Sequence, residues 1–190
     1  IDALYGLPGQ GMAQLLHTLG AIVRLRPDRI ALFGYAHVPW MKRHQRMIDE
    51  AALPGLVARH AQAETAAAFL VAEGYCRIGI DHFALPDDAL ARAARQGGLR
   101  RNFQGYTVDP ADALIGLGAS AIAQLPQGYL QNETAIGRYR QRVEAEGLAV
   151  ARGFALGAED RMRAHAIERL MCDLEFSTRA LRGRFGAVSA

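Results

Sequence analysis

The chain has 190 residues, of which 51% are hydrophobic and 22% charged, and its formal net charge is +3. This composition is ordinary for a globular protein, and the length allows one substantial core or one core with an appended small domain. Because no arginine cluster repeats on one face and no apolar run approaches the roughly 18 residues of a membrane span, we expect neither a nucleic-acid partner nor a membrane span.

The first part of the chain, up to about residue 86, alternates strand-like and helix-like segments. The short apolar runs that predict strands are residues 1–5, 29–35 and 75–80. The segments that predict helices are residues 12–23, 41–50 and 56–73, the last of them ended by Gly74 at a C′ position. Strands separated by helices predict right-handed crossovers and a parallel sheet, with binding residues at the carboxyl ends of the strands.

After Pro86 the strand-like segments follow one another too closely for helical crossovers, so we expect antiparallel pairing. These segments are residues 103–108, 114–124, 128–131 and 148–156. Helices are expected from an Asp87 cap to Gly97, from Thr134 to Glu146 and over residues 159–174. The tail that follows is rich in arginine, glycine, serine and alanine, and we expect it to be partly disordered. The sequence therefore predicts two domains, residues 1–86 and 87–190.

Neither cysteine has the sequence context of a metal site. Cys76 and Cys172 lie far apart and form no C-x-x-C pair and no zinc-ligand spacing. Both are most simply buried thiols, so we expect no metal ligand from them and a reducing, cytoplasmic location. His37 has no second ligand at i+3 or i+4, which favours a hydrogen-bonding anchor over a metal ligand.

Two loops at the ends of early strands offer polar groups to a ligand. The turn over residues 6–11 lies between a strand and a helix, but it lacks the Gly-Lys-Ser/Thr ending of a phosphate loop. Asp2, on the strand before it, has a carboxylate suited to ribose hydroxyls or to an ammonium or sulfonium charge. A salt bridge to a neighbouring arginine is the alternative. Ala36, after the second strand, can reach a ligand only through its backbone.

Two later segments carry polar side chains between aromatic and glycine residues. Asp81 and His82 follow the third strand, and a direct contact between them is not expected because adjacent residues on a strand point to opposite faces. Alternation along the next strand should put Asn102, Gln104 and Tyr106 on one face, where they would suit a carboxylate or a pyrrole N–H. A polar, solvent-facing edge strand is the alternative interpretation.

Four segments of the chain together resemble one protein family. They are Ile1–Gln10, Tyr35–Pro39, Gly79–Ala84 and Asn102–Thr107. In this order they resemble the oxygen-independent coproporphyrinogen III oxidases, which are radical S-adenosylmethionine (SAM) enzymes of haem biosynthesis. The resemblance implies an α/β fold. The C-terminal half of a partial (β/α) TIM-like radical SAM barrel would be followed by a small, mostly helical α+β domain with a short antiparallel sheet.

The resemblance also implies a reaction, the oxidative decarboxylation of coproporphyrinogen III propionates to vinyl groups. Its cofactors would be a [4Fe–4S] cluster and S-adenosyl-L-methionine, and its partner an electron donor. Asp2, Ala36 and Ile122 match family positions that contact S-adenosylmethionine, and Gln104 matches a position in the substrate-side signature. The family's cluster cysteines fall upstream of Ile1. We therefore expect a monomeric fragment without catalytic residues, inactive alone.

Two alternative functions stay open. A haem chaperone would share the cluster and the Gly-Leu-Pro turn, but such paralogues lack the His-Phe-Ala and Asn-Phe-Gln-Gly-Tyr-Thr signatures present at residues 82–84 and 102–107. A protein- or RNA-binding module would instead use a basic surface, and its binding would depend steeply on salt. The residues of that surface would be Arg138, Arg140, Arg142 and Arg152.

Overall fold

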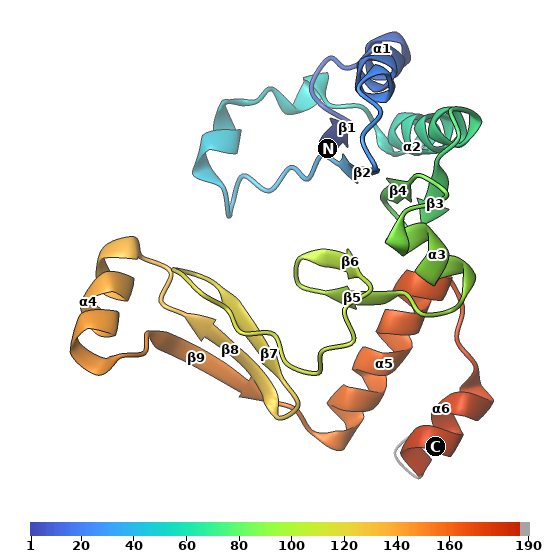
Figure 1. The fold of residues 1–190 in the computed structure, drawn as a ribbon. Coiled ribbons are helices and arrows are strands. Elements are labelled where there is room, and N and C mark those ends of the chain that lie inside the picture. Colours follow the sequence, from blue (N-terminus) through green and yellow to red (C-terminus); the bar gives the residue numbers. More distant parts are fainter. Residues whose placement is uncertain (187–190) are drawn as a thin grey trace. The chain divides into compact units, whose positions relative to one another are not determined.

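A computed structural model describes residues 1–186 of the chain, which form two compact units. The first unit runs from Ile1 to Leu99, and the second begins at Arg100 (Figure 1). Within residues 1–186, no helix combines the length and the apolar character that crossing a membrane requires.

The first unit is built on a small sheet with two long helices. Its strands are β1 (Asp2–Tyr5), β2 (Arg29–Gly34), β3 (Cys76–Ile78) and β4 (His82–Ala84). Its helices are α1 (Met12–Arg24), α2 (Leu56–Ala72) and α3 (Ala89–Arg95), with the short 3-10 helices η1 (Arg43–Met47) and η2 (Glu50–Ala52) between β2 and α2. The long helices and the strands around them agree with the sequence prediction to within a few residues.

The sheet has the order β1-β2-β4-β3, and β1 with β2 is its only parallel pair. β4 pairs antiparallel with both β2 and β3, so β3 runs in the same direction as β1 and β2, as predicted for residues 75–80, but it does not pair with them, and the sheet is mixed rather than parallel. The reason is Gly79, whose φ of 57° lies in the left-handed region that glycine adopts at little cost. This glycine reverses the chain, and the returning strand β4 inserts between β2 and β3.

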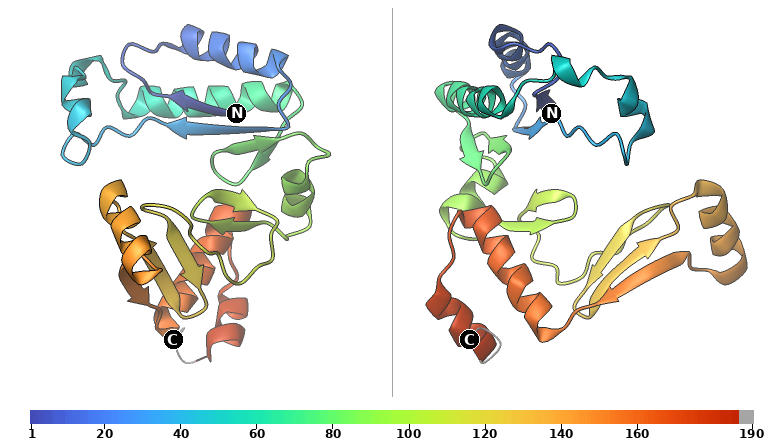
Figure 2. Two further views of the ribbon diagram at one scale, coloured as in Figure 1. Left: turned by 60° about the vertical axis from the view of Figure 1, so that its left-hand side comes forward. Right: turned by 180° about the vertical axis from the view of Figure 1, so that it is seen from behind.

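The core of the first unit lies between the sheet and the two long helices. α1 and α2 run along one side of β1 and β2 (Figure 2), and the apolar side chains from both layers form one buried cluster. Its members are Ala3, Leu15, Leu19, Ile30, Leu32, Ala66, Ala67, Leu70, Tyr75 and Phe83. Because strand residues alternate between faces, the neighbours of Ala3 and Leu32 along each strand point to the opposite side of the sheet.

Two helical predictions for the first unit need correction. Residues 41–50 do not form an α-helix, but two single turns of 3-10 helix. The cap of α3 is Asp88 rather than Asp87: the Asp88 carboxylate accepts a hydrogen bond from the Leu90 N–H at 2.7 Å. The same carboxylate pairs with the Arg29 guanidinium at 2.9 Å, a contact that favours Asp88 over its neighbour and that the local sequence does not reveal.

The second unit holds a hairpin, a three-stranded sheet and three helices. The strands are β5 (Arg100–Asn102), β6 (Gly105–Thr107), β7 (Ile122–Leu125), β8 (Gly128–Asn132) and β9 (Val150–Ala155). The helices are α4 (Ile136–Glu146), α5 (Ala158–Asp173) and α6 (Thr178–Phe185). All the strand pairs here are antiparallel, which confirms the prediction from their close spacing.

Two segments of the second unit differ from the sequence prediction. The strand expected over residues 114–124 is reduced to β7, with a single bridge between Leu114 and Gln124 before it. Gly118 and Ser120 interrupt the strand, because both have positive φ angles, 102° and 62°. The tail, expected to be partly disordered, forms α6, which the Ser177 hydroxyl caps by accepting from the Ala180 N–H. Residues 187–190 lie outside the described residues.

Candidate functional site

The face of the sheet opposite to the core carries a row of three residues across three strands. Asp2 is paired with Ala31 in the parallel register of β1 and β2, and Ala31 is paired with His82 in the antiparallel register of β2 and β4. Residues paired in this way share one face of a sheet, and neighbouring strands lie about 4.8 Å apart. Asp2 and His82 therefore lie on the same face with only the short Ala31 side chain between them.

Asp81 and His82 form a direct pair, contrary to the expectation from strand alternation. The Nδ1 atom of His82 lies 2.7 Å from the Oδ1 atom of Asp81, and both side chains are largely buried. The alternation rule does not apply because Asp81 lies in the turn that begins at Gly79, before β4 starts. The Phe33 ring meets the His82 ring edge-on, with 5.7 Å between centroids. The carboxylate and the aromatic ring together fix the orientation of the imidazole.

A cavity of about 280 Å³ lies within the first unit, where Asp81 and Arg77 approach α2. Its other lining residues are Tyr5, Leu32, Phe33, Gly34, Ala63, Ala67, Ile80 and Phe83. Asp2 and Ala36 are not among the residues that line it.

The loop that carries Ala36 leaves the end of β2 and is fixed at its first residue. The Tyr35 N–H donates to the Tyr5 carbonyl at 2.8 Å, and the Arg59 guanidinium donates to the Tyr35 carbonyl at 2.7 Å. Ala36 itself is exposed. Its carbonyl accepts a hydrogen bond from the Gln45 Nε2 atom at 3.0 Å. Ala36 is thus an exposed residue whose carbonyl is held by the Gln45 side chain.

His37 acts as a hydrogen-bonding anchor in this loop. Its Nδ1 atom lies 3.3 Å from the Tyr35 hydroxyl, and its Nε2 atom lies 3.1 Å from a Glu50 carboxylate oxygen. Both ring nitrogens are therefore engaged by side chains of the loop. Across residues 1–186, His, Cys, Asp and Glu side chains nowhere gather into a group of three or more that would hold a metal ion.

In the second unit, Gln104 lies in a tight turn rather than on a strand. The Asn102 carboxamide oxygen accepts a hydrogen bond from the Gln104 N–H at 2.8 Å, and Phe103 and Gln104 connect β5 to β6. The predicted common face for Asn102, Gln104 and Tyr106 is therefore wrong, because an Asx turn breaks the alternation. The Gln104 side chain is exposed, whereas the Tyr106 ring is buried and its hydroxyl donates to the Met171 carbonyl at 2.8 Å.

Ile122 begins the edge strand β7 and is paired with Gln131 of β8. Gly116 packs directly on its main chain: a Cβ atom added to Gly116 would lie 2.7 Å from the Ile122 carbonyl carbon. This contact explains the need for glycine in a segment whose small residues predict a close backbone approach. Because Gly116 covers the Ile122 carbonyl, the half-buried side chain is the part of Ile122 that suits a ligand.

Sequence reasoning missed two residues that shape the Ala36 loop. Gln45, in η1, and Arg59, in α2, both donate to loop carbonyls, and Gln45 is buried with only 9% of its surface exposed. No periodicity or motif marks either residue. The only available signal is chemical, since a glutamine side chain can satisfy a backbone N–H and a backbone carbonyl at once.

The chain is closely similar to a group of curated oxidases along almost its whole length. It is 52% identical over 186 residues to the oxygen-independent coproporphyrinogen III oxidase of Bradyrhizobium diazoefficiens, covering 98% of this chain and 41% of that protein. It is 50% identical over 185 residues to the anaerobic coproporphyrinogen III oxidase 1 of Cereibacter sphaeroides, covering 97% and 41%. The predicted family resemblance is confirmed. The chain spans about two fifths of the length of these coproporphyrinogen III oxidases.

A solved structure of the same kind confirms the α/β fold class. The chain matches the coproporphyrinogen III oxidase of Escherichia coli, described as a radical SAM enzyme, with a TM-score of 0.90 and 40% sequence identity. The match covers 97% of this chain and 43% of the Escherichia coli oxidase. No protein-family model matches the chain.

Proposed function

We propose that this chain is part of an oxygen-independent coproporphyrinogen III oxidase, which converts two propionates of coproporphyrinogen III to vinyl groups and yields protoporphyrinogen IX. The observation that carries the proposal is the 52% identity to such an oxidase over 98% of the chain. When bound, a [4Fe–4S] cluster and S-adenosylmethionine supply the radical chemistry that removes a hydrogen atom from a propionate side chain. The haem-chaperone alternative is not favoured, because the matched relatives are oxidases.

The cysteines of this chain do not fit a cluster. Iron–sulfur clusters are held by thiolates, and burial raises the pKa of the Cys172 thiol to about 11, which keeps it protonated. Cys172 belongs to the second unit and Cys76, the other free cysteine, to the first. We therefore assign no cluster ligand to these residues and expect the ligands elsewhere in the complete polypeptide. Two free thiols are also what we expect of a protein that works in the reducing cytoplasm.

The residues matched to S-adenosylmethionine contacts have the chemistry that this cofactor requires. The Asp2 carboxylate is exposed on the face opposite to the core, where it can accept hydrogen bonds from ribose hydroxyls or face the sulfonium charge. Ala36 offers its main chain, with a methyl group small enough for close approach. Ile122 offers a branched apolar side chain that can pack on an adenine ring.

Gln104 is the residue we propose for contact with the tetrapyrrole substrate. Its side chain is exposed at the tip of the β5–β6 hairpin, and the Asx turn fixes the backbone beneath it. A neutral amide can donate to a propionate carboxylate and accept from a pyrrole N–H. We further propose a division of labour, with residues 1–86 completing a barrel and residues 87–190 covering the substrate, in a monomer that takes its electrons from a separate donor.

The test uses the complete polypeptide that contains this chain, reconstituted anaerobically with iron and sulfide. We expect release of CO2 from coproporphyrinogen III that depends on S-adenosylmethionine, together with a vinyl product. Asp2→Asn should raise the KM for S-adenosylmethionine by about tenfold, because a hydrogen bond to a charged group contributes roughly 1.5 kcal/mol or more. Asp28→Asn, which alters another exposed carboxylate of the first unit, serves as the matched control.

Two results would count against this proposal. An intact cluster without CO2 release would exclude the decarboxylation. Equal KM values for the Asp2 and Asp28 variants would remove Asp2 from the cofactor site.

A further inference from the structure

Gln45 is a buried glutamine whose amide group is fully engaged by the backbone of one loop. Its Nε2 atom donates to the Ala36 carbonyl at 3.0 Å, and its Oε1 atom accepts from the Val38 N–H at 2.6 Å. Only 9% of its surface is exposed. A buried polar side chain is costly unless its hydrogen bonds are made, so these two bonds tie η1 to the Ala36 segment.

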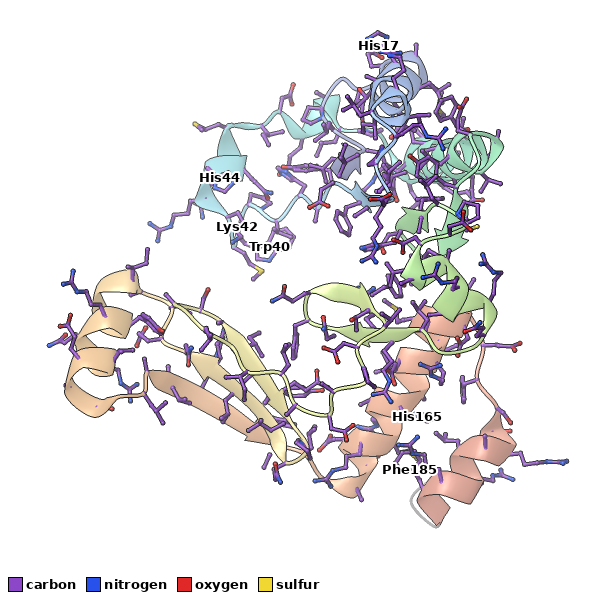
Figure 3. The ribbon with its side chains drawn as sticks, in the orientation of Figure 1. His17, Trp40, Lys42, His44, His165 and Phe185 are labelled. Carbon is purple, nitrogen blue, oxygen red and sulfur yellow. The ribbon has the colours of Figure 1, made fainter. Side chains whose placement is uncertain are left out.

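The chain between Val38 and Gln45 turns back on itself, which brings the Gln45 side chain next to Ala36 and Val38. The Val38 carbonyl accepts hydrogen bonds from the N–H groups of Met41 and Lys42, and the Lys42 carbonyl accepts one from the Gln45 N–H, all at 2.9 Å. Trp40, Lys42 and His44 project from this stretch (Figure 3). The Gln45 side chain therefore closes the loop from Ala36 to Gln45 by hydrogen bonding to the Ala36 carbonyl and the Val38 N–H at its start.

Other contacts of the loop fix the residues on either side of Ala36, but not the peptide group that carries the Ala36 carbonyl. Arg59 holds the Tyr35 carbonyl, and the Tyr35 hydroxyl and Glu50 hold the His37 ring. Among the interactions described for residues 1–186, only Gln45 contacts the Ala36 main chain through a side chain. The orientation of the peptide group that carries the Ala36 carbonyl thus depends on the Gln45 amide.

We propose that Gln45 is a positioning residue for S-adenosylmethionine binding, acting through the Ala36 backbone. The inference rests on the proposed function, in which the main chain of Ala36 meets the cofactor. Gln45 occupies one lone pair of the Ala36 carbonyl and leaves the second lone pair for a ligand, whereas the Ala36 N–H belongs to the preceding peptide group, whose Tyr35 carbonyl is held by Arg59. Holding the peptide in place before binding spares the cofactor the entropic cost of ordering it.

Two substitutions separate the two hydrogen bonds. Gln45→Met keeps the length of the side chain and removes both bonds. Gln45→Glu keeps an acceptor for the Val38 N–H and has no donor for the Ala36 carbonyl once its carboxyl group is ionised; because burial raises the pKa of such a group, this variant is measured over a series of rising pH. His44→Ala, at an exposed position one residue away, is the matched control. All four proteins are made as the complete polypeptide, reconstituted anaerobically.

The first measurement is amide hydrogen exchange at Val38, made without cofactor. Exchange should accelerate in Gln45→Met by about tenfold or more, since the N–H loses its acceptor, and should stay as in the unaltered protein in Gln45→Glu and His44→Ala. Exchange that stays slow in Gln45→Met would show that the Gln45 side chain does not hold the Val38 N–H, independently of any cofactor.

The second measurement is the dissociation constant for S-adenosylmethionine, with the KM and kcat of turnover. Both Gln45 variants should bind about tenfold more weakly, the effect of roughly one lost hydrogen bond, with kcat at saturating cofactor within about twofold of the unaltered protein. His44→Ala should bind normally. A loss of kcat without a change in KM would contradict a positioning role.

The outcomes distinguish this inference from the proposed function. If the unaltered protein fails to bind S-adenosylmethionine, the proposed function is overturned and the inference with it. If the unaltered protein binds and both Gln45 variants bind equally well, only the inference is overturned. Weaker binding by Gln45→Met with normal binding by Gln45→Glu at every pH of the series would exclude the Ala36 carbonyl as the group that Gln45 positions.

Discussion

The two units of the chain bury their apolar residues very differently. The first has a continuous core, in which Leu15, Leu19, Ile30 and Leu70 are completely inaccessible to water. In the described part of the second unit, the buried apolar residues are few and scattered, namely Tyr106, Ala149 and Cys172. Large apolar side chains of that unit, such as Phe154 and Leu148, are 59% and 72% exposed.

This difference changes what a polar residue can do in each unit. In the first unit, Asp2 and His82 lie on a sheet whose other face is anchored in the core, so the backbone beneath them is rigid. In the second unit, Gln104 lies on a hairpin that depends on a few specific contacts, such as the Tyr106 hydroxyl on the Met171 carbonyl. Stability should therefore respond to core truncation mainly in the first unit.

The largest expected effect is the truncation of Leu70 in α2. Leu70→Ala should lower the free energy of unfolding by about 3 kcal/mol, because it removes a fully buried side chain and leaves a cavity. Val71→Ala, on the exposed side of the same helix, should cost less than about 0.5 kcal/mol. Urea unfolding followed by circular dichroism measures both. If Phe154→Ala were as costly as Leu70→Ala, the contrast between the two units would be lost.

A smaller effect should appear at alkaline pH in the second unit. Burial raises the pKa of Cys172 from an ordinary value of 9.0 to about 11, so the unfolded chain loses this proton before the folded chain does. The stabilisation by the protonated thiol is complete below pH 9 and is lost as the pH rises through 11, by roughly 2 kcal/mol in all. Cys172→Ala should abolish that part of the pH dependence.

The control for this effect is Cys76→Ala in the first unit, which should keep the alkaline loss of stability. Unfolding free energies at pH 8 and pH 10.5, about the range of the titration, give the comparison for each variant. An identical pH dependence in Cys172→Ala and the unaltered chain would show that the thiol ionises as readily in the folded state as in the unfolded one.

The smallest expected effects come from the helix caps, which offer a matched pair across the two units. Asp88→Ala should cost about 1 to 2 kcal/mol, because Asp88 caps α3 and also pairs with Arg29. Ser177→Ala removes only the hydroxyl cap of α6 and should cost about 0.5 kcal/mol. Hydrogen exchange in the first turn of each helix checks both. A larger loss of unfolding free energy in Ser177→Ala than in Asp88→Ala would contradict this prediction.

Much of the fold is predictable from periodicity and spacing. The long helices, the buried strands β1 and β2 and the antiparallel pairing after Pro86 all follow from local pattern. The errors occur where tertiary contacts or single residues decide. Gly79 reverses the chain after β3 and returns it as the unpredicted strand β4, and Arg29 selects Asp88 as a cap. Neither contact leaves a periodic signal in the sequence.

The candidate site likewise has a part that the sequence predicts and a part that it does not. Polar residues at strand ends can be picked out by residue type, but their surroundings depend on turns that alternation rules do not describe. The Asp81–His82 pair and the position of Gln104 both follow from turns in place of the expected strand. The role of Gln45 is not predictable from the sequence, because it depends on a turn that brings this side chain to the backbone of Ala36 and Val38.

The loop closed by Gln45 also contains the only tryptophan of the sequence. Trp40 lies two residues beyond Val38, and 72% of its surface is exposed. Its indole should emit at the long wavelengths of a hydrated fluorophore, without competition from a second tryptophan within these 190 residues. The chain thus carries an intrinsic optical reporter within the segment next to the proposed cofactor contact, and a shift of the Trp40 emission when the complete polypeptide is titrated with S-adenosylmethionine would report a change around that loop without any label.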